Sequence, residues 1–396
     1  MKKIVYLLLL ITTIALVVNC SSSKSKGSTS TVALPKDNFA NDIDEEIYVP
    51  HRKSDRKTFF KGSPAEDKWV DSVYNQLSLN EKIGQLFMVA AYSNKDEEHF
   101  KTIEKLVTDY KIGGVIFFQG GPVRQANLTN RFQRKSKVPL FVGIDAEWGL
   151  SMRLDSTYRF PWNMTLGAIR DLKLLEKVGA QMGKESKRMG VHFNFAPVID
   201  INTNPKNPII GYRSFGEDKK NVTESAIALM TGVQSNGVFS TGKHFPGHGD
   251  TSTDSHHTLP MVNFSKERIE NVELYPYKRM FDEGLESVMV AHLNVPNLEP
   301  RENFPTSLSY PVVTELLQKD LAFDGLIFTD ALNMKGASNF KKPGDIDLAA
   351  FMAGNDILLF AENVPVALEK ITAAYNDTLI SEDRIAQSVK KILRYK

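Results

Sequence analysis

The sequence predicts an α/β fold, a (β/α)8 TIM-type barrel that forms a single catalytic domain over residues 61–396. Three observations support this prediction: eight short apolar runs, amphipathic segments between them, and polar residues where the runs end. Continuous apolar runs are typical of parallel strands that are covered on both faces. Their alternation with helical segments favours a parallel sheet or barrel.

The eight predicted strands are short and rich in β-branched and aromatic residues. In chain order they span residues 84–91, 112–118, 140–147, 192–200, 238–245, 287–295, 325–331 and 356–361. Residues 171–189 and 221–235, which lie between strands, have apolar residues at helical spacing. A doubly wound sheet is the main alternative, but no glycine-rich phosphate-binding turn follows the first strand.

Polar and titratable residues gather where the predicted strands end. They are Asp145, Asp200, Lys243, His244, His292 and Asp330. Structural polar residues alone would be scattered over both ends of the barrel. Because the carboxyl ends of barrel strands face the active site, this placement predicts a catalytic site there.

Composition and charge are those of an ordinary globular protein. Hydrophobic residues make up 42% of the chain, which is enough for a large core, and the formal net charge is +2. No basic stripe is interleaved with aromatic residues, so we expect no nucleic-acid partner.

The first 20 residues resemble a secretory signal peptide. Lys2 and Lys3 precede the apolar residues 4–18, and the sequence VVNC ends at Cys20, the only cysteine of the chain. This end is similar to a bacterial lipobox, which predicts lipidation of Cys20, a membrane anchor, and a location in the bacterial cell envelope, either periplasmic or on the outer membrane. A plain signal peptide or an uncleaved anchor with an incidental cysteine is the alternative.

Residues 21–60 are predicted to be a disordered tether and an N-terminal segment. Residues 21–41 are rich in Ser, Thr and Lys and contain little that could be buried. Such a composition favours an extended, solvated chain.

The stretch KHFPGHGDTSTDSHHTLP, residues 243–260, contains four of the eight histidines of the chain. It could bind a metal, relay protons, hold a polar substrate or form a solvated loop. Its small residues, Gly247, Gly249, Ser252 and Ser255, favour a mobile flap.

This stretch and the later FTDALNM resemble the signature segments of glycoside hydrolase family 3, in its single-domain β-N-acetylglucosaminidase branch. The similarity runs from LSLNEKIGQLF near residue 77 to the C-terminal RIAQSVKKILRYK. It implies a retaining double displacement with a covalent glycosyl-enzyme intermediate.

The resemblance assigns three catalytic roles. Asp330 matches the nucleophile, His256 the acid/base, and Asp254 the residue that orients His256. An imidazole titrates near about pH 6.5, so it can donate and accept a proton close to neutrality. A neighbouring carboxylate can fix its tautomer.

The resemblance also implies five substrate-binding residues. They are Asp145, Arg153, Arg213, Lys243 and His244. His292 is a possible further contact. After the third strand this chain reads DAEWGLSMRL where the family usually has D-Q-E-G-G-R-V. The departure places Trp148 near the rim, either as an aromatic platform or as packing.

The function that the resemblance implies is removal of terminal N-acetylglucosamine from peptidoglycan fragments by an exo-acting enzyme without a cofactor. A family 3 β-glucosidase and a phosphate-dependent glycosidase are alternatives. From other classes, a non-catalytic sugar-binding lipoprotein and a metal-dependent barrel hydrolase remain; His244, His248, His256 and Asp254 would be the metal ligands. No metal is expected, because the first strand lacks the His-x-His pair of zinc-dependent barrels.

Overall fold

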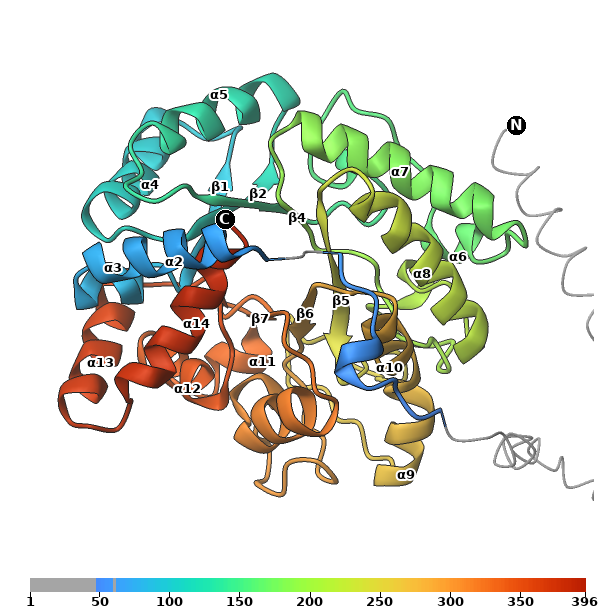
Figure 1. Cartoon of the computed structure of the whole chain (residues 1–396). Coiled ribbons are helices and arrows are strands. Elements are labelled where there is room, and N and C mark those ends of the chain that lie inside the picture. Colours follow the sequence, from blue (N-terminus) through green and yellow to red (C-terminus); the bar gives the residue numbers. More distant parts are fainter. Residues whose placement is uncertain (1–47, 60–61) are drawn as a thin grey trace, which may run out of the picture. The chain divides into compact units, whose positions relative to one another are not determined.

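In the computed structural model, which describes residues 48–59 and 62–396, eight parallel strands follow one another around one barrel (Figure 1). The order is β7-β6-β5-β4-β3-β2-β1-β8. β8 pairs with β1, and a parallel bridge between Phe328 and Ile357 links β7 to the segment before β8. The predicted (β/α)8 architecture is therefore confirmed.

The strands lie within or close to the eight predicted runs, but most are shorter. They are β1 (Phe87–Tyr92), β2 (Gly114–Gln119), β3 (Phe141–Ile144), β4 (Phe193–Asn194), β5 (Phe239–Phe245), β6 (Ser287–Val290), β7 (Leu326–Thr329) and β8 (Leu358–Leu359). Gly84, predicted as the start of the first strand, instead ends a helix. Asp200 lies beyond β4 in a loop, because regular pairing of β4 stops at Asn194.

Helices surround the strands, as Figure 1 shows. The α-helices are α2 (Pro64–Gln76), α3 (Leu79–Gly84), α4 (Glu97–Asp109), α5 (Pro122–Gln133), α6 (Asn163–Leu166), α7 (Leu172–Arg188), α8 (Lys219–Gln234), α9 (Lys266–Arg268), α10 (Tyr275–Asp282), α11 (Lys335–Ser338), α12 (Asp345–Ala353), α13 (Val364–Asn376) and α14 (Glu382–Arg394). Within the described residues, two π-helical segments, η5 (Ile269–Glu273) and η7 (Pro311–Asp320), and four short 3-10 turns complete the layer. The turns are η2 (Lys53–Asp55), η3 (Leu150–Met152), η4 (Gly211–Arg213) and η6 (Thr306–Leu308).

Local sequence determines where several helices begin. Ser63 and Ser78 each form a capping box, with Glu66 and Glu81 respectively, at the start of α2 and α3. Each serine oxygen accepts a hydrogen bond from a backbone N–H of the first turn, and the glutamate accepts one in return. Such caps satisfy donors that have no partner inside the helix.

Phenylalanine rings fill the barrel interior. The ring of Phe328 lies 5.2 Å from the rings of both Phe193 and Phe195, and all three side chains are buried. Gly143 in β3 makes room for them, because a Cβ there would lie 2.6 Å from the Phe195 ring. The interior is thus a packed core rather than a pore.

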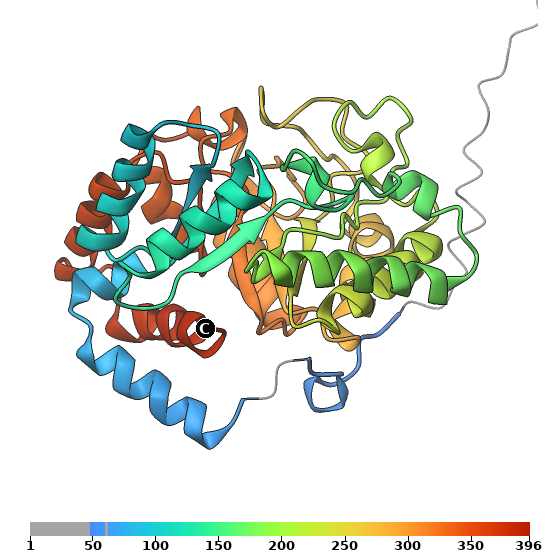
Figure 2. The same cartoon turned by 90° about the horizontal axis from the view of Figure 1, so that it is seen from above.

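Residues 48–59 lie against the barrel, although the sequence-based boundary placed them with the tether. The Tyr48 hydroxyl and the His51 backbone N–H donate hydrogen bonds to Asp282, and the Arg56 guanidinium lies 3.2 Å from the same carboxylate. Phe59 N–H donates to Glu286. In Figure 2 this segment and α2, both blue, lie on the side of the domain opposite the long loops.

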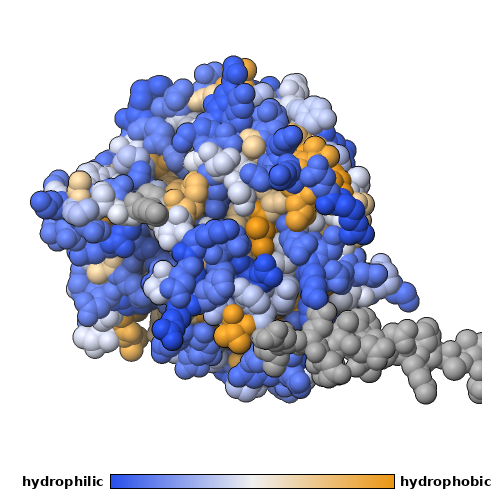
Figure 3. Space-filling view, turned by 45° about the vertical axis from the view of Figure 1, so that its right-hand side comes forward, coloured by the Kyte–Doolittle hydropathy of each residue, from blue (hydrophilic) through white to orange (hydrophobic). Residues whose placement is uncertain are grey.

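The face of the domain in Figure 3 is mostly hydrophilic, with scattered apolar patches. Among the residues that the structure describes, no helix is both long and apolar enough to cross a bilayer. The predicted signal peptide, Cys20 and residues 21–47 lie outside the described part of the chain.

Candidate active site

A cavity of about 510 Å³ is lined by residues from the carboxyl ends of the strands and the loops that follow them. Eight of the sequence-predicted residues line it: Asp145, Trp148, Arg153, Arg213, Lys243, His244, His256 and Asp330. Asp254 is hydrogen-bonded to His256, which lines the cavity, and His292 is hydrogen-bonded to Ala331, the residue after Asp330. The predicted residues therefore gather at one site.

Asp145, directly after β3, accepts two charged hydrogen bonds. Lys243 Nζ lies 2.9 Å from its Oδ1, and Arg153 Nη2 lies 2.7 Å from its Oδ2. Burial raises the pKa of Asp145, but the two cations outweigh burial and hold the pKa well below its usual range. The carboxylate is therefore ionised and fixed in direction, as a partner for sugar hydroxyls must be.

Glu147 forms the second carboxylate of this network, which the residue assignments from sequence omitted. Arg213 donates to it through Nε at 3.0 Å and Nη2 at 2.7 Å, and Lys243 Nζ lies 2.8 Å from Oε1. Burial opposes ionisation of Glu147, but Arg213 and Lys243 lower its pKa to about 2. Lys243 thus bridges two buried carboxylates, which raise its own pKa against the effect of burial.

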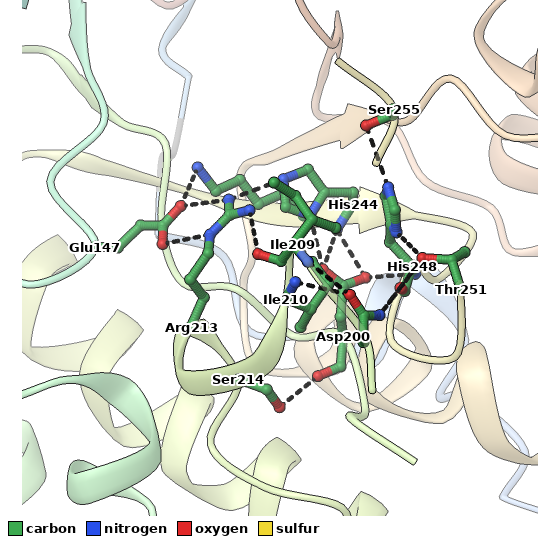
Figure 4. Close-up of polar contacts among 12 residues, drawn as sticks. Glu147, Asp200, Ile209, Ile210, Arg213, Ser214, His244, His248, Thr251 and Ser255 are labelled. Carbon is green, nitrogen blue, oxygen red and sulfur yellow. Dashed lines mark hydrogen bonds and ion pairs between the residues drawn. The ribbon is translucent and has the colours of Figure 1, made fainter. Parts of the chain in front are cut away.

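Asp200 orients His244 (Figure 4). Its Oδ2 lies 2.7 Å from His244 Nδ1, and its Oδ1 accepts the His248 backbone N–H at 2.7 Å. Arg213 Nη2 lies 3.3 Å from His244 Nε2. Since arginine only donates, Nε2 is the acceptor, and Nδ1 therefore carries the hydrogen that Asp200 accepts.

Asp330 follows β7 and is only partly exposed. Its Oδ1 accepts the Ala331 N–H at 2.8 Å. Burial raises the pKa of Asp330, but His244, His292, this N–H group and Lys243 outweigh burial and lower the pKa. The carboxyl group is therefore ionised at neutral pH, as a nucleophile requires.

His292 is fully buried and lies behind the strand ends. Its Nδ1 is 2.6 Å from the Ser307 hydroxyl, and its Nε2 is 3.0 Å from the Ala331 carbonyl oxygen, to which it donates. Burial lowers its pKa. Both ring nitrogens are engaged by the protein, so His292 supports the segment that carries Asp330 and does not line the cavity.

The loop after β5, residues 246–264, carries the predicted acid/base. His256 Nδ1 lies 2.7 Å from Asp254 Oδ1, which also accepts the His256 backbone N–H at 2.8 Å. Burial raises the pKa of Asp254, but the two bonds from His256 outweigh it and lower the pKa. The pairing engages Nδ1, so Nε2 is the nitrogen that is left for proton exchange.

The first half of this loop is anchored. His248 Nδ1 lies 2.7 Å from the Thr251 hydroxyl, and its Nε2 lies 3.2 Å from Ser255 Oγ. A Cβ at Gly249 would lie 1.9 Å from the Ile201 carbonyl oxygen. Gly249 therefore allows a close approach of the backbone, and Ser255 bonds to His248, whereas the sequence suggested that both give the loop mobility. Burial lowers the pKa of His248 to about 4, so its ring is neutral.

Trp148 lines the cavity and also contacts another aromatic residue. Its ring centroid lies 4.3 Å from that of Trp162. Part of the ring is exposed to solvent. Trp148 therefore takes part both in packing and in the wall of the cavity.

His244 of β5 and two histidines of the loop that follows it, His248 and His256, do not converge on one point. His244, His248 and His256 each contact a different partner: Asp200, Thr251 with Ser255, and Asp254. Across residues 48–59 and 62–396, no group of three or more His, Cys, Asp or Glu side chains is arranged to hold a metal ion.

Asp200 and Glu147 are the functional residues that the site assignments missed. Both were visible in the sequence, Asp200 near a predicted strand end and Glu147 within DAEWGLSMR. Their positions in the sequence do not show which side chains the two carboxylates contact. In the structure, Asp200 orients His244 and Glu147 holds Arg213 and Lys243.

Comparisons with known proteins agree with this geometry. Residues 78–395 match the model of the glycosyl hydrolase family 3 N terminal domain. Beta-hexosaminidase A of Pseudoalteromonas piscicida is 33% identical over 330 residues, which cover 74% of this chain and 54% of that protein. The chain thus spans about half the length of this relative.

Two solved structures are also similar. A β-N-acetylglucosaminidase from Paenibacillus sp. str. FPU-7 matches with a TM-score of 0.76 and 37% identity, covering 81% of this chain and 62% of that one. A structure described as beta-glucoside phosphorylase BglX matches with a TM-score of 0.79 and 27% identity, covering 84% of this chain and 61% of that one.

Proposed function

The chain belongs to glycosyl hydrolase family 3, and we propose that it is a retaining, exo-acting β-N-acetylglucosaminidase that removes terminal N-acetylglucosamine from peptidoglycan fragments. One observation carries the proposal. A single cavity is lined by an ionised carboxylate, Asp330, and by an imidazole, His256, whose other nitrogen is held by Asp254. A nucleophile and a proton donor facing one space are what a double displacement requires.

In the first step, an Asp330 oxygen attacks the anomeric carbon, and the bond from this carbon to the leaving oxygen breaks. The His256 imidazolium gives its Nε2 proton to that oxygen. In the second step, neutral His256 accepts a proton from water, the water oxygen attacks the anomeric carbon, and Asp330 is released. Asp254 stabilises the charged ring in the first step and keeps Nδ1 protonated in the second.

The paired cations and carboxylates hold the sugar. Asp145 accepts hydrogen bonds from hydroxyls, and Arg153 and Lys243 donate to them. Because these groups are already fixed by one another, little side-chain freedom is lost when the sugar binds. Groups that are already held in place also stabilise the transition state better than water molecules can.

The substrate class is supported by the relatives. The name of the Pseudoalteromonas protein includes hexosaminidase, and the Paenibacillus structure is described as an N-acetylglucosaminidase. The envelope location rests on the signal-like residues 1–20 and on lipidation of Cys20. A cell-surface or periplasmic address would bring the enzyme to peptidoglycan.

Phosphate as acceptor is a second candidate, favoured by the similarity to the phosphorylase. An imidazole acid/base, unlike a carboxylate, does not repel an anion that approaches the glycosyl-enzyme. Phosphate would then attack the anomeric carbon and yield a sugar 1-phosphate in place of the free sugar.

A panel of 4-nitrophenyl β-glycosides, N-acetylated and not, tests the proposal. We expect rapid release of nitrophenol from the N-acetylglucosaminide, retention of configuration by NMR, and no turnover by Asp330→Ala. Faster cleavage of the glucoside, or inversion, would overturn the assignment. Repeating the assay with phosphate distinguishes the acceptors, since only phosphorolysis gives sugar 1-phosphate.

A further inference from the structure

We infer that an aromatic wall beside the cavity binds the sugar on the leaving-group side, and that Arg159 favours a leaving sugar that carries a carboxylate. The aromatic wall consists of Trp148, Trp162 and Tyr212. The inference rests on the proposed glycosidase function, because it assigns a place to the second sugar of the same substrate.

The aromatic wall runs outward from the cavity. Trp148 lines the cavity, its ring centroid lies 4.3 Å from that of Trp162, and Trp162 lies 4.2 Å from Tyr212. The ring planes are inclined by 69° and 52°, so the three rings do not form one flat plane. A ligand that extends out of the cavity past Trp148 meets the other two rings next.

The outer rings remain accessible to a ligand. Tyr212 is 54% exposed, and Trp162 is only half-buried. Large aromatic side chains are usually buried, and a group of them left in water next to a cavity is typical of a binding surface. The C–H face of a sugar ring packs well on such rings, while its hydroxyls stay in water.

Arg159 adds a positive charge at the outer part of the aromatic wall. Its guanidinium carbon lies 4.2 Å from the centre of the Trp162 ring, and the side chain is exposed. Within the described part of the chain it forms no ion pair with a carboxylate. Arg124 is different, because it pairs with Asp155 at 2.6 Å. Arginine binds carboxylates through strong, directed hydrogen bonds, so Arg159 suits an acidic leaving sugar.

Two hydrogen bonds fix the aromatic wall relative to the catalytic residues. The Asn163 side chain donates to the Arg213 carbonyl oxygen at 2.7 Å, which joins the neighbours of Trp162 and Tyr212. The Phe160 N–H donates to the Trp148 carbonyl oxygen at 3.1 Å. Because Arg213 itself lines the cavity, the aromatic wall and the site for the first sugar share one support.

Three substrates separate the contributions. β-N-acetylglucosaminyl fluoride has no leaving sugar, N,N′-diacetylchitobiose has a neutral one, and N-acetylglucosaminyl-β-1,4-N-acetylmuramic acid has one with a carboxylate. The variants are Tyr212→Ala and Arg159→Gln. Tyr310→Ala is the matched control, since Tyr310 is 46% exposed and does not line the cavity.

For Tyr212→Ala, kcat/KM for both disaccharides relative to the fluoride should fall by about 3- to 10-fold, the range of one aromatic contact. For Arg159→Gln, kcat/KM relative to the fluoride should fall by about 10-fold for the acidic disaccharide alone, as expected for one exposed charge-assisted bond. Tyr310→Ala should leave these ratios unchanged.

Unchanged ratios in Tyr212→Ala and Arg159→Gln would overturn the inference while the proposed function stands, provided that the wild type hydrolyses the fluoride. An equal loss on all three substrates would assign both residues a structural role and would also overturn it. If the wild type cleaves neither the fluoride nor the disaccharides, the proposed function itself fails.

Discussion

Two regions of the active site differ in how they hold their polar residues. At the ends of β3 and β5, the side chains of Lys243 and Glu147 are 3% and 0% exposed, and Lys243 contacts two carboxylates. In the loop after β5, the His256 side chain is 54% exposed and is paired with Asp254. The first region is buried and multiply paired, and the second is open to solvent.

The difference teaches how binding and proton transfer are divided. In the proposed mechanism, the fixed, desolvated groups of the first region recognise the sugar with little reorganisation. The proposed proton donor, His256, by contrast lies on a loop that is anchored through His248. Substitutions in the buried network should therefore affect stability as well as binding, whereas substitutions in the exposed pair should affect chemistry alone.

The largest effect is expected for Asp330→Ala. Removing the proposed nucleophile should lower kcat by about 10⁴-fold or more. The melting temperature should change little, because Asp330 makes no ion pair within the described residues. Steady-state kinetics and thermal unfolding measure the two effects. Residual activity above one hundredth of the wild type would contradict the assignment.

His256→Ala should reduce turnover of substrates with poor leaving groups by about 10²- to 10⁴-fold. Activated leaving groups, which need no proton, should be affected far less. His257→Ala is the matched control, since His257 is its exposed neighbour and is not among the residues that line the cavity. Kinetics on a series of aryl glycosides test the prediction; an equal loss across the series would count against His256 as the acid.

Lys243→Ala should destabilise the fold by about 3–5 kcal/mol, because it leaves two buried carboxylates without their shared cation. Lys137→Ala removes an exposed ion pair with Glu81, at 2.8 Å, and should cost no more than about 1 kcal/mol. Urea unfolding measures both. Equal effects of the two substitutions would show that burial of the network does not matter to stability.

Glu273, which lies next to Gly247 in the loop after β5, makes the free energy of unfolding dependent on pH. A Cβ at Gly247 would lie 2.8 Å from the Glu273 side chain, and burial raises the pKa of Glu273 to about 7 despite Arg268. Its folded pKa exceeds the usual value of 4.5. The stabilisation is therefore complete below that value and is lost as the pH rises through about 7.

Glu273→Gln keeps the group neutral at every pH. Relative to this variant, the wild type should lose about 3 kcal/mol of unfolding free energy between about pH 4.5 and pH 8. Unfolding of both proteins at the two pH values gives the difference. If it does not change with pH, Glu273 is not protonated in the folded protein near neutrality.

The sequence predicts the architecture well, because strand periodicity and strand ends are local signals. Asp145 and Asp330 each follow their strand directly, as expected. Asp200 lies six residues beyond β4, because the chain continues along β5 through a bridge from Val198 to Lys243 instead of regular pairing.

Partners are harder to predict than positions. Lys243 and Asp145 are 98 residues apart, and Arg213 and Glu147 are 66 apart, so barrel closure brings them together. Nothing in the local sequence joins Trp148 to Trp162 and Tyr212. The role of Glu147 is hard to predict for the same reason, because it is defined by cations from two other segments.

In the proposed mechanism, Asp330 forms a covalent bond with the sugar. A 5-fluoro-N-acetylglucosaminyl fluoride, which slows breakdown of the glycosyl-enzyme, should label the protein at one equivalent. Peptide mass spectrometry should then locate the sugar on Asp330, and the Asp330→Ala variant should remain unlabelled. An enzyme that turns this substrate over without a label, or a label on another residue, would contradict the account.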